Sequence, residues 1–130
     1  MIKFTIPVVP RTKKNSQEIR YKNCKGRRVP FISPSALYKQ FEEECCWLIP
    51  KKYKLKIDYP VNVKALYFVK RNGRVDITNL ESALMDALVK AEVLADDSAI
   101  KPAIVVSTDG SRVYYDKDNP RIEVEIERME

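Results

Sequence analysis

Several segments of this chain alternate hydrophobic and polar residues, the pattern of strands that bury one face and leave the other in water. The clearest are residues 61–69, rich in β-branched and aromatic side chains, and residues 121–127, which alternate strictly. Residues 19–32 form a further candidate, a hairpin that turns at residues 23–26. The remaining predicted strands are residues 3–6, 101–107 and 113–115, the last two around a turn at Asp109 and Gly110.

Two other segments carry apolar residues at helical spacing. The first is expected to begin with Ser33 as N-cap and Pro34 in the first helical position, and to end before Pro50. The second covers about residues 79–91. The expected apolar stripes are Leu37, Phe41, Cys45 and Leu48 in the first helix, and Leu80, Ala83, Leu84, Ala87, Leu88 and Ala91 in the second. This order predicts an α/β (α+β) fold, a mixed β-sheet with two main helices in one compact domain over residues 1–130.

Composition removes several kinds of chemistry. The 130 residues include no histidine, which excludes a His general base, a Ser-His-Asp triad and a His-ligated zinc. The three cysteines, Cys24, Cys45 and Cys46, form no C-x-x-C motif and are odd in number, so we interpret Cys45 and Cys46 as helix-core residues of a reduced, cytoplasmic protein. No apolar run suits a signal peptide or a membrane span, and we expect no membrane partner and no small-molecule cofactor.

Charge is unevenly distributed along the chain, whose formal net charge is +6 at pH 7. Residues 1–75 hold 18 Lys and Arg against 5 Asp and Glu, a net +13, whereas residues 76–130 hold 6 against 13, a net −7. A basic half of this size predicts a polyanionic partner. The acidic half requires a separate explanation.

Carboxylates stand at two element boundaries, with Asp76 just before the second helix and Asp96–Asp97 in the loop after it. Mg²⁺ and Mn²⁺ prefer such oxygen ligands, and converging carboxylates repel one another unless a cation lies between them. An acidic cluster inside a basic protein is typical of a metal-dependent nuclease. The structural alternatives are that Asp76 caps the helix, that Thr78 and Glu81 form a capping box, and that Asp96–Asp97 is a solvated turn.

The separation of these groups limits the geometry of a shared site. A helix of about 13 residues is roughly 20 Å long, and the residues from Ala91 to Asp97 span about the same distance when extended. An extended chain is therefore just long enough to bring Asp97 back to Asp76 within one subunit. Completion of the site by a second subunit is the competing arrangement.

Residues 76–88 (DITNLESALMDAL) followed by residues 91–98 (AEVLADDS) resemble the signature of RusA-type Holliday junction resolvases. In that family an Asp-x-Asp-Asn-Leu segment opens a helix containing Asp-Ala-Leu and leads to an Asp-Asp pair; the proline loop at residues 10–15 is also similar to the family's N-terminal segment. The resemblance implies a RusA-like homodimer that nicks four-way DNA junctions symmetrically with Mg²⁺ or Mn²⁺. It implies that Asp76 and Asp97, with Asp96 beside it, are the catalytic metal ligands.

The sequence departs from this motif at two positions. Thr78 stands where the second aspartate usually lies, and Ser82 where a catalytically important lysine is found one turn into the helix. Candidate substitutes are Asp96 or Asp86 for the missing ligand, and Lys90, Lys101 or Arg74 for the missing cation. We expect Thr78, Asn79, Ser82 and Asp86 to surround the metal ligands, with an ordinary exposed position as the alternative for Asp86.

The basic residues gather in loops, and the cluster from Lys70 to Arg74 leads directly to Asp76. The DNA-binding candidates are Arg11, Lys13, Lys14, Asn15, Arg27, Arg28, Lys70, Arg71, Arg74 and Lys101. Tyr21, Phe31 and Tyr38 either stack on unpaired bases at a junction centre or belong to the core.

Together these features favour a metal-dependent, structure-selective DNA endonuclease that resolves four-way junctions in recombination and repair. Its expected partners are branched DNA and a second copy of the chain, and its expected cofactor is Mg²⁺ or Mn²⁺. The alternatives are a catalytically weak or inactive DNA-binding module of the same fold, and an RNA-binding or RNA-processing protein.

Overall fold

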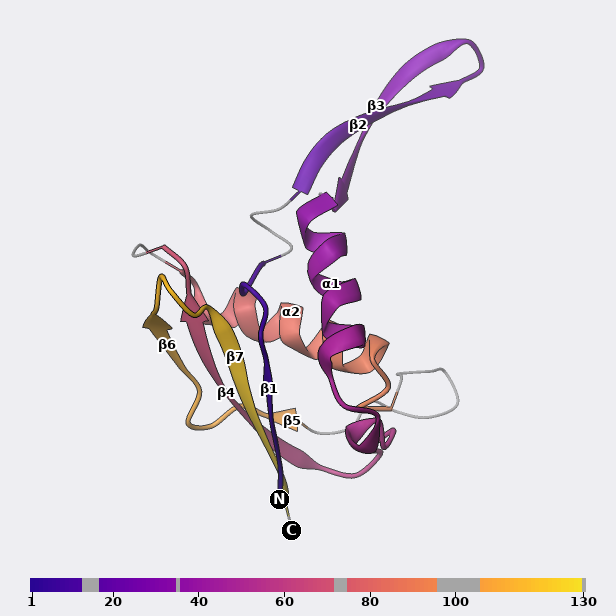
Figure 1. The fold of residues 1–130 in the computed structure, drawn as a ribbon. Helices are drawn as coiled ribbons and strands as arrows, with labels where there is room; N and C mark the ends of the chain where they lie inside the picture. Colours follow the sequence, from indigo (N-terminus) through magenta and orange to yellow (C-terminus); the bar gives the residue numbers. More distant parts are fainter. Residues whose placement is uncertain (13–16, 35, 72–74, 96–105, 130) are drawn as a thin grey trace.

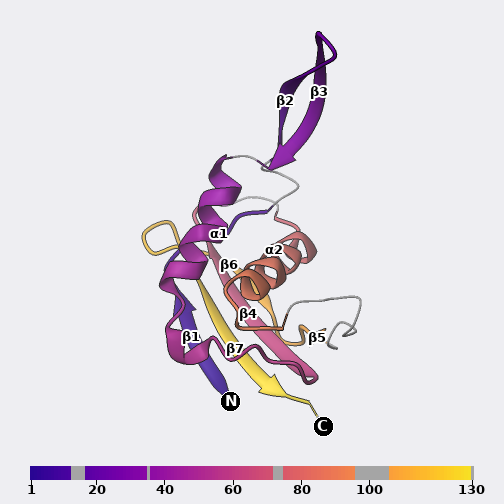
Figure 2. The ribbon, with the colours of Figure 1, turned by 90° about the vertical axis from the view of Figure 1, so that its right-hand side faces the viewer.

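A mixed five-stranded sheet and two helices packed on one of its faces form the body of the protein (Figures 1 and 2). The computed structural model describes residues 1–12, 17–34, 36–71, 75–95 and 106–129. The sheet contains β1 (Ile2–Ile6), β4 (Val61–Val69), β5 (Val106–Ser107), β6 (Arg112–Tyr115) and β7 (Arg121–Arg128), and the helices are α1 (Ala36–Leu48) and α2 (Ile77–Lys90). A 3-10 turn, η2 (Lys51–Tyr53), follows α1, and β2 (Gln17–Cys24) pairs with β3 (Arg27–Pro34) in a separate hairpin. The predicted fold class is confirmed.

The direction of the strands decides which loops meet. The order in the sheet is β1-β7-β4-β5, and β6 also pairs with β4. Both β1 and β4 are antiparallel to β7, so they run in the same direction and end at the same edge of the sheet. Helix α2 begins just beyond that edge, after β4. No helix in the described ranges has the length and apolar character needed to cross a membrane.

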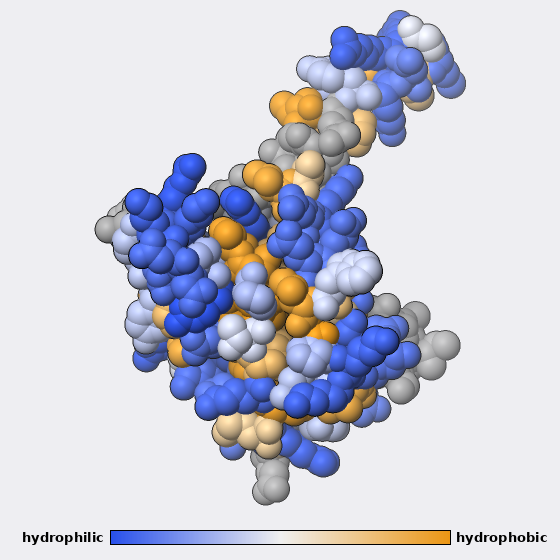
Figure 3. All heavy atoms as spheres, in the orientation of Figure 1, coloured by the Kyte–Doolittle hydropathy of each residue, from blue (hydrophilic) through white to orange (hydrophobic). Residues whose placement is uncertain are grey.

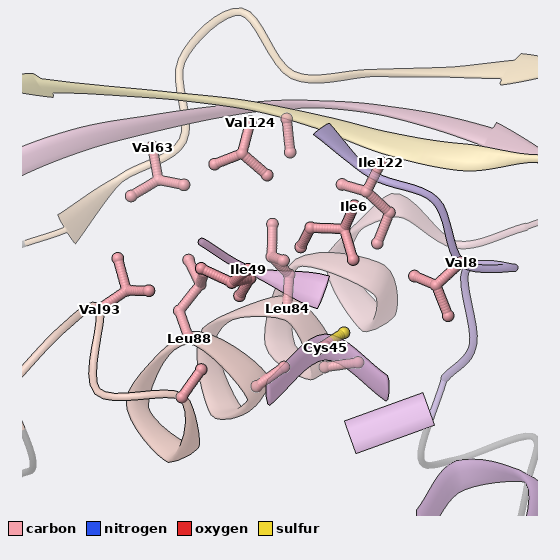
Figure 4. Packing of buried hydrophobic residues seen from close by; sticks show 14 of the residues in the cluster. Ile6, Val8, Cys45, Ile49, Val63, Leu84, Leu88, Val93, Ile122 and Val124 are labelled. Carbon is pink, nitrogen blue, oxygen red and sulfur yellow. The ribbon is translucent and has the colours of Figure 1, made fainter. Parts of the chain in front are cut away.

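The core lies between the sheet and the helices (Figure 4). Alternate residues of β4 are buried, and the register places them beside the buried residues of β7, for example Ala65 opposite Val124 and Tyr67 opposite Ile122. Every member of the predicted stripe of α2 is buried against this face, as the hydrophobic periodicity requires. That part of the prediction is confirmed.

Two elements differ from the prediction at the start of α1. Ser33 and Pro34 belong to β3, where they pair with Glu18 and Gln17, and the helix begins at Ala36. The hairpin ladder extends to Pro34, a residue that suits the end of a strand because it has no N–H to donate. The predicted cap at Ser33 is therefore wrong.

The buried stripe of α1 is also rotated from the predicted one. Leu37 and Leu48 are exposed, whereas Tyr38 and Ile49 are buried beside Phe41 and Cys45 in the core. Tyr38 is thus a core residue and not a surface for stacking on bases.

The predicted turn at Asp109 and Gly110 lies between β5 and β6, although these two strands do not pair with each other. Strands β5 and β6 both pair with β4, in parallel, one after the other along its edge. Side chains bridge the interruption: the Asn62 amide donates to the Asp109 carbonyl and accepts from the Asp109 N–H, and the Ser111 hydroxyl accepts from the Ala65 N–H at 3.0 Å. The turn therefore acts as a bulge in an edge strand, and residues 101–105 lie outside the described residues.

Candidate active site

Asp76 stands at the amino-terminal end of α2, at the sheet edge where β1 and β4 end. Its backbone is extended, with φ −77° and ψ 112°, and its carbonyl accepts from the N–H groups of Asn79 and Leu80. One side-chain oxygen, Oδ1, accepts from the Thr78 N–H at 2.9 Å. Asp76 is therefore the N-cap of this helix, as one alternative reading of the sequence held.

The capping box predicted at Thr78 and Glu81 does not form. The helix begins at Ile77, so Thr78 lies inside its first turn and its N–H is itself the group that Asp76 caps. Aspartate is among the strongest N-cap residues, which explains why the helix starts two residues earlier than a cap at Thr78 would allow.

Capping uses only part of the Asp76 carboxylate. The side chain is exposed, and within the described residues only the Oδ1 bond to Thr78 is made. An ionised carboxylate has about four acceptor positions, so Oδ2 is free to bind a cation. An exposed, unpaired carboxylate oxygen is a suitable donor for Mg²⁺ or Mn²⁺.

Basic side chains from two loops line a cleft at this same edge of the sheet. Arg11 follows β1, and Lys70 and Arg71 follow β4, so the parallel course of the two strands brings the three cations together. The cleft holds about 560 Å³, and its walls are Val9, Pro10, Arg11, Thr12, Leu37, Val69, Lys70, Arg71, Val75 and Leu80. Figure 3 shows apolar side chains between the sheet and α1 on this side of the molecule. The cleft combines an apolar floor with a basic rim next to Asp76.

The other candidate residues on α2 lie farther along the helix. Asn79 is half-buried and Ser82 is exposed, both within two turns of Asp76. Asp86 is exposed, lies near Tyr38 of α1, and stands ten residues beyond Asp76, about 15 Å along the axis. One cation cannot contact both Asp76 and Asp86.

Lys90 does not replace the cation that the motif lacks at Ser82. It lies in the last turn of α2, roughly 21 Å from Asp76, and its Nζ is 3.8 Å from the Glu42 carboxylate of α1. Lys90 therefore ties the two helices together at the far end from the cleft.

Several predicted site residues lie outside the described residues: Lys13, Lys14, Asn15, Arg74, Asp96, Asp97 and Lys101. In the described part of the chain, no three acidic, cysteine or histidine side chains gather into a metal-binding cluster. The last described residue before Asp96 is Ala95, whose N–H donates to the Ile57 carbonyl at 2.8 Å. Ile57 precedes β4, so the chain leaves this part of the structure at the opposite end of β4 from Asp76.

The predicted DNA-binding residues Arg27 and Arg28 lie on the β2–β3 hairpin, outside the cleft, and are exposed. Sequence reasoning identified the basic residues of the cleft but missed its apolar walls and the buried Thr12, because no local pattern reveals which loops share a sheet edge.

Two buried groups are kept in their neutral forms. Burial, and then the charges of Cys46 and Glu44, raise the pKa of the Cys45 thiol to about 12, which fits its predicted role as a core residue rather than a nucleophile. Burial, followed by the nearby Glu81 carboxylate, raises the pKa of the Tyr67 hydroxyl. Neither group is poised to lose its proton near neutral pH.

Comparison with known proteins adds one finding. The sequence model of a family described as "Endodeoxyribonuclease RusA" matches residues 7–127, nearly the whole chain. A search of curated proteins found no match. The matched range includes the basic cleft, Asp76 and both helices.

Proposed function

The chain belongs to the RusA endodeoxyribonuclease family, the nucleases that resolve Holliday junctions, and from this membership we propose that it cleaves branched DNA with a divalent cation bound at Asp76. The observation that carries the proposal is the position of Asp76, whose exposed carboxylate stands next to a cleft rimmed by Arg11, Lys70 and Arg71. The proposed ligands are Asp76, Asp97 and Asp96, and the proposed ion is Mg²⁺ or Mn²⁺.

The donor chemistry supports a hard cation at this position. Asp76 offers an oxygen that no described group occupies, the sequence contains no histidine, and the Cys45 thiol is buried and protonated. When bound, the ion would act as a Lewis acid on the scissile phosphate and activate water for in-line attack.

The chain's own groups have separate tasks. Arg11, Lys70 and Arg71 bind backbone phosphates along the rim and hold the substrate in register. The N-terminus of α2 adds a positive dipole end, which favours the negative charge of a phosphate near Asp76. With Thr78 and Ser82 in place of the motif's aspartate and lysine, these groups carry more of the electrostatic work.

We further propose that the active form is a homodimer, since two symmetric incisions need two sites. Leu94 lies beside Leu88, about 18 Å along α2 from Asp76, and a fully extended chain covers about 10 Å over the three residues to Asp97. A site within one subunit therefore requires a chain that runs straight back along α2. A site shared between subunits removes this requirement.

The test uses a labelled four-way junction with Mg²⁺ or Mn²⁺ and the variant Asp97→Asn. We expect unchanged junction binding and a loss of cleavage of at least about a hundredfold, as for removal of a group that stabilises developing charge. The matched control is Asp118→Asn, which removes an exposed carboxylate elsewhere and should cleave normally. Wild-type cleavage by Asp97→Asn would refute the assignment of this ligand.

Mixing two inactive variants tests the shared site. In an equal mixture of Asp76→Asn and Asp97→Asn, heterodimers regain one complete site if the ligands come from different subunits, and about a quarter of all sites become active. If both ligands come from one subunit, the mixture stays inactive.

Thr78 and Ser82 favour one second candidate, a DNA-binding module of the same fold with little or no cleavage. Such a protein shifts the junction on a gel and yields no nicked product with either metal. Competition with structured RNA tests the remaining alternative, an RNA-binding or RNA-processing protein, which would prefer the RNA.

A further inference from the structure

The β2–β3 hairpin projects from the body beyond the amino-terminal end of α1 (Figures 1 and 2). Every residue from Tyr21 to Phe31 is exposed, and none of the side chains described in the two strands belongs to the hydrophobic core. A two-stranded ribbon with no packed face is only marginally stable in water. The hairpin therefore has the character of an element that is completed by a partner.

The turn of the hairpin is well formed in spite of this exposure. Lys25 and Gly26 have positive φ angles of 51° and 75°, as a two-residue type I′ turn requires. This turn has the twist that suits paired strands, so the ribbon is built to hold its shape as it projects.

Beyond its base, the hairpin carries only positive charge, and its one acidic residue is Glu18, near the start of β2. Residues 19–34 include five basic side chains and no acidic one: Arg20, Lys22, Lys25, Arg27 and Arg28. Figure 3 shows hydrophilic side chains over its outer part. Five cations against one carboxylate at the base make the ribbon complementary to a polyanion, and they repel a second copy of the same ribbon.

Cations lie on both faces of the ribbon. The Arg28 guanidinium lies 4.5 Å from the ring centre of Tyr21, and Lys22 Nζ lies 5.8 Å from that of Phe31. Because Tyr21 and Lys22 are adjacent in β2, their side chains point to opposite faces. Each face thus presents a cation over an aromatic ring. A partner that contacts only one face of the ribbon would leave the pair on the other face unused.

The base of the hairpin adjoins the candidate site. Arg11, which precedes β2, and Leu37, which follows β3, both line the basic cleft next to Asp76. At about 3.3 Å per residue, the eight-residue strands extend roughly 26 Å from that base. A nucleic acid bound in the cleft would continue along the hairpin.

We propose that the β2–β3 hairpin is a DNA-binding arm that enters a groove of a duplex arm of the junction, with backbone phosphates on both sides of the ribbon. The major groove of B-DNA, about 12 Å wide, admits a two-stranded ribbon, and its walls supply the phosphates that cations on both faces require. Arg28 and Lys22, held by their rings, contact opposite walls. The proposal rests on the proposed function to the extent that DNA is the substrate.

The first test compares two double substitutions of equal charge. Arg27→Gln with Arg28→Gln removes two cations from the arm, and Lys51→Gln with Lys52→Gln removes two exposed cations from η2 on the body. We expect the arm variant to bind a four-way junction at least about tenfold more weakly, with a salt slope reduced by about two. The body variant should bind within about twofold of wild type; equal affinities for the two variants would overturn the proposal.

The second test needs no substitution in the arm. Cys24 is exposed next to the turn, Cys45 is buried and Cys46 is half-buried, so a charged thiol reagent reports on Cys24, with Cys24→Ser giving the background. Saturating junction or linear duplex should slow modification of Cys24 by about tenfold or more, because the thiol enters a groove. An unchanged rate, or protection by structured RNA alone, overturns the proposal.

Both tests are run without divalent cations and so do not depend on cleavage. A wild-type protein that binds no DNA contradicts the proposed function. A wild-type protein that binds DNA while Cys24 reacts freely contradicts only the arm.

Discussion

Asp76 caps helix α2 and, in the proposed site, binds the metal ion, and different substitutions separate these two roles. Asp76→Asn keeps an oxygen that can accept from the Thr78 N–H at 2.9 Å, because asparagine and aspartate are equally good N-caps. It removes the negative charge that a divalent cation requires. Asp76→Ala removes both the cap and the ligand.

The magnitudes follow from these contacts. Loss of the charge from the positive end of the helix should cost about 0.3–1 kcal/mol, whereas loss of the cap bond should cost about 1 kcal/mol or somewhat more. Junction cleavage should fall at least about a hundredfold in both variants. Mg²⁺ at ten times its Kd should stabilise the wild-type protein by about 1.4 kcal/mol and leave both variants unchanged.

The assay combines urea unfolding, with and without Mg²⁺, and single-turnover junction cleavage, with Asp118→Asn as the control. If Asp76→Asn cleaves at the wild-type rate or keeps the stabilisation by Mg²⁺, Asp76 is not a metal ligand. If Asp76→Asn destabilises the protein as much as Asp76→Ala, the side-chain cap does not hold the start of the helix.

Three further predictions concern the core and the cleft. Leu84→Ala, at a position that is 0% exposed, should lower the free energy of unfolding by about 3 kcal/mol, whereas Leu37→Ala, at 53% exposure, should cost less than about 1 kcal/mol; equal urea midpoints would contradict the packing. Tyr67→Phe removes a buried hydroxyl with no hydrogen-bond partner among the described residues and should raise stability at pH 7 by about 1 kcal/mol. Burial raises the pKa of Tyr67 above 10.0, so the folded state resists ionisation of this hydroxyl and loses stability as the pH rises beyond 10. The decrease in urea midpoint from pH 7 to a pH above 10 should therefore be smaller in Tyr67→Phe, which has no hydroxyl to ionise, than in wild type. Lys70→Gln with Arg71→Gln should reduce the salt slope of junction binding by about two, and an unchanged slope would exclude phosphate contacts at the cleft.

The elements that sequence predicts well are those whose pattern is imposed by burial. Strand β4 and helix α2 each present a single apolar face to the same core, so their periodicity alone identifies them. The start of α1 could not be predicted in this way. Pairing of β3 with β2 extends through Pro34 and takes Ser33 into the ladder, a tertiary preference that outweighs a local capping signal.

The candidate site is likewise only partly predictable from the sequence. Asp76 is identifiable from its place before a helix, but its meeting with Arg11, Lys70 and Arg71 depends on β1 and β4 both pairing with β7, a strand from the other end of the chain. Such long-range pairing leaves no local mark in the sequence. The projection of the hairpin is equally hidden, because alternating residues predict strands and do not reveal that both faces are exposed from Tyr21 to Phe31.

The most direct test of junction cleavage uses a four-way junction labelled on each strand in turn and incubated with the wild-type protein and Mg²⁺ or Mn²⁺. A parallel control reaction contains a chelator from the start. The proposal predicts paired nicks at symmetric positions in two opposing strands, with 5′-phosphate and 3′-hydroxyl ends, and no product in the presence of the chelator. Junction binding without any nicked strand under either metal would contradict it.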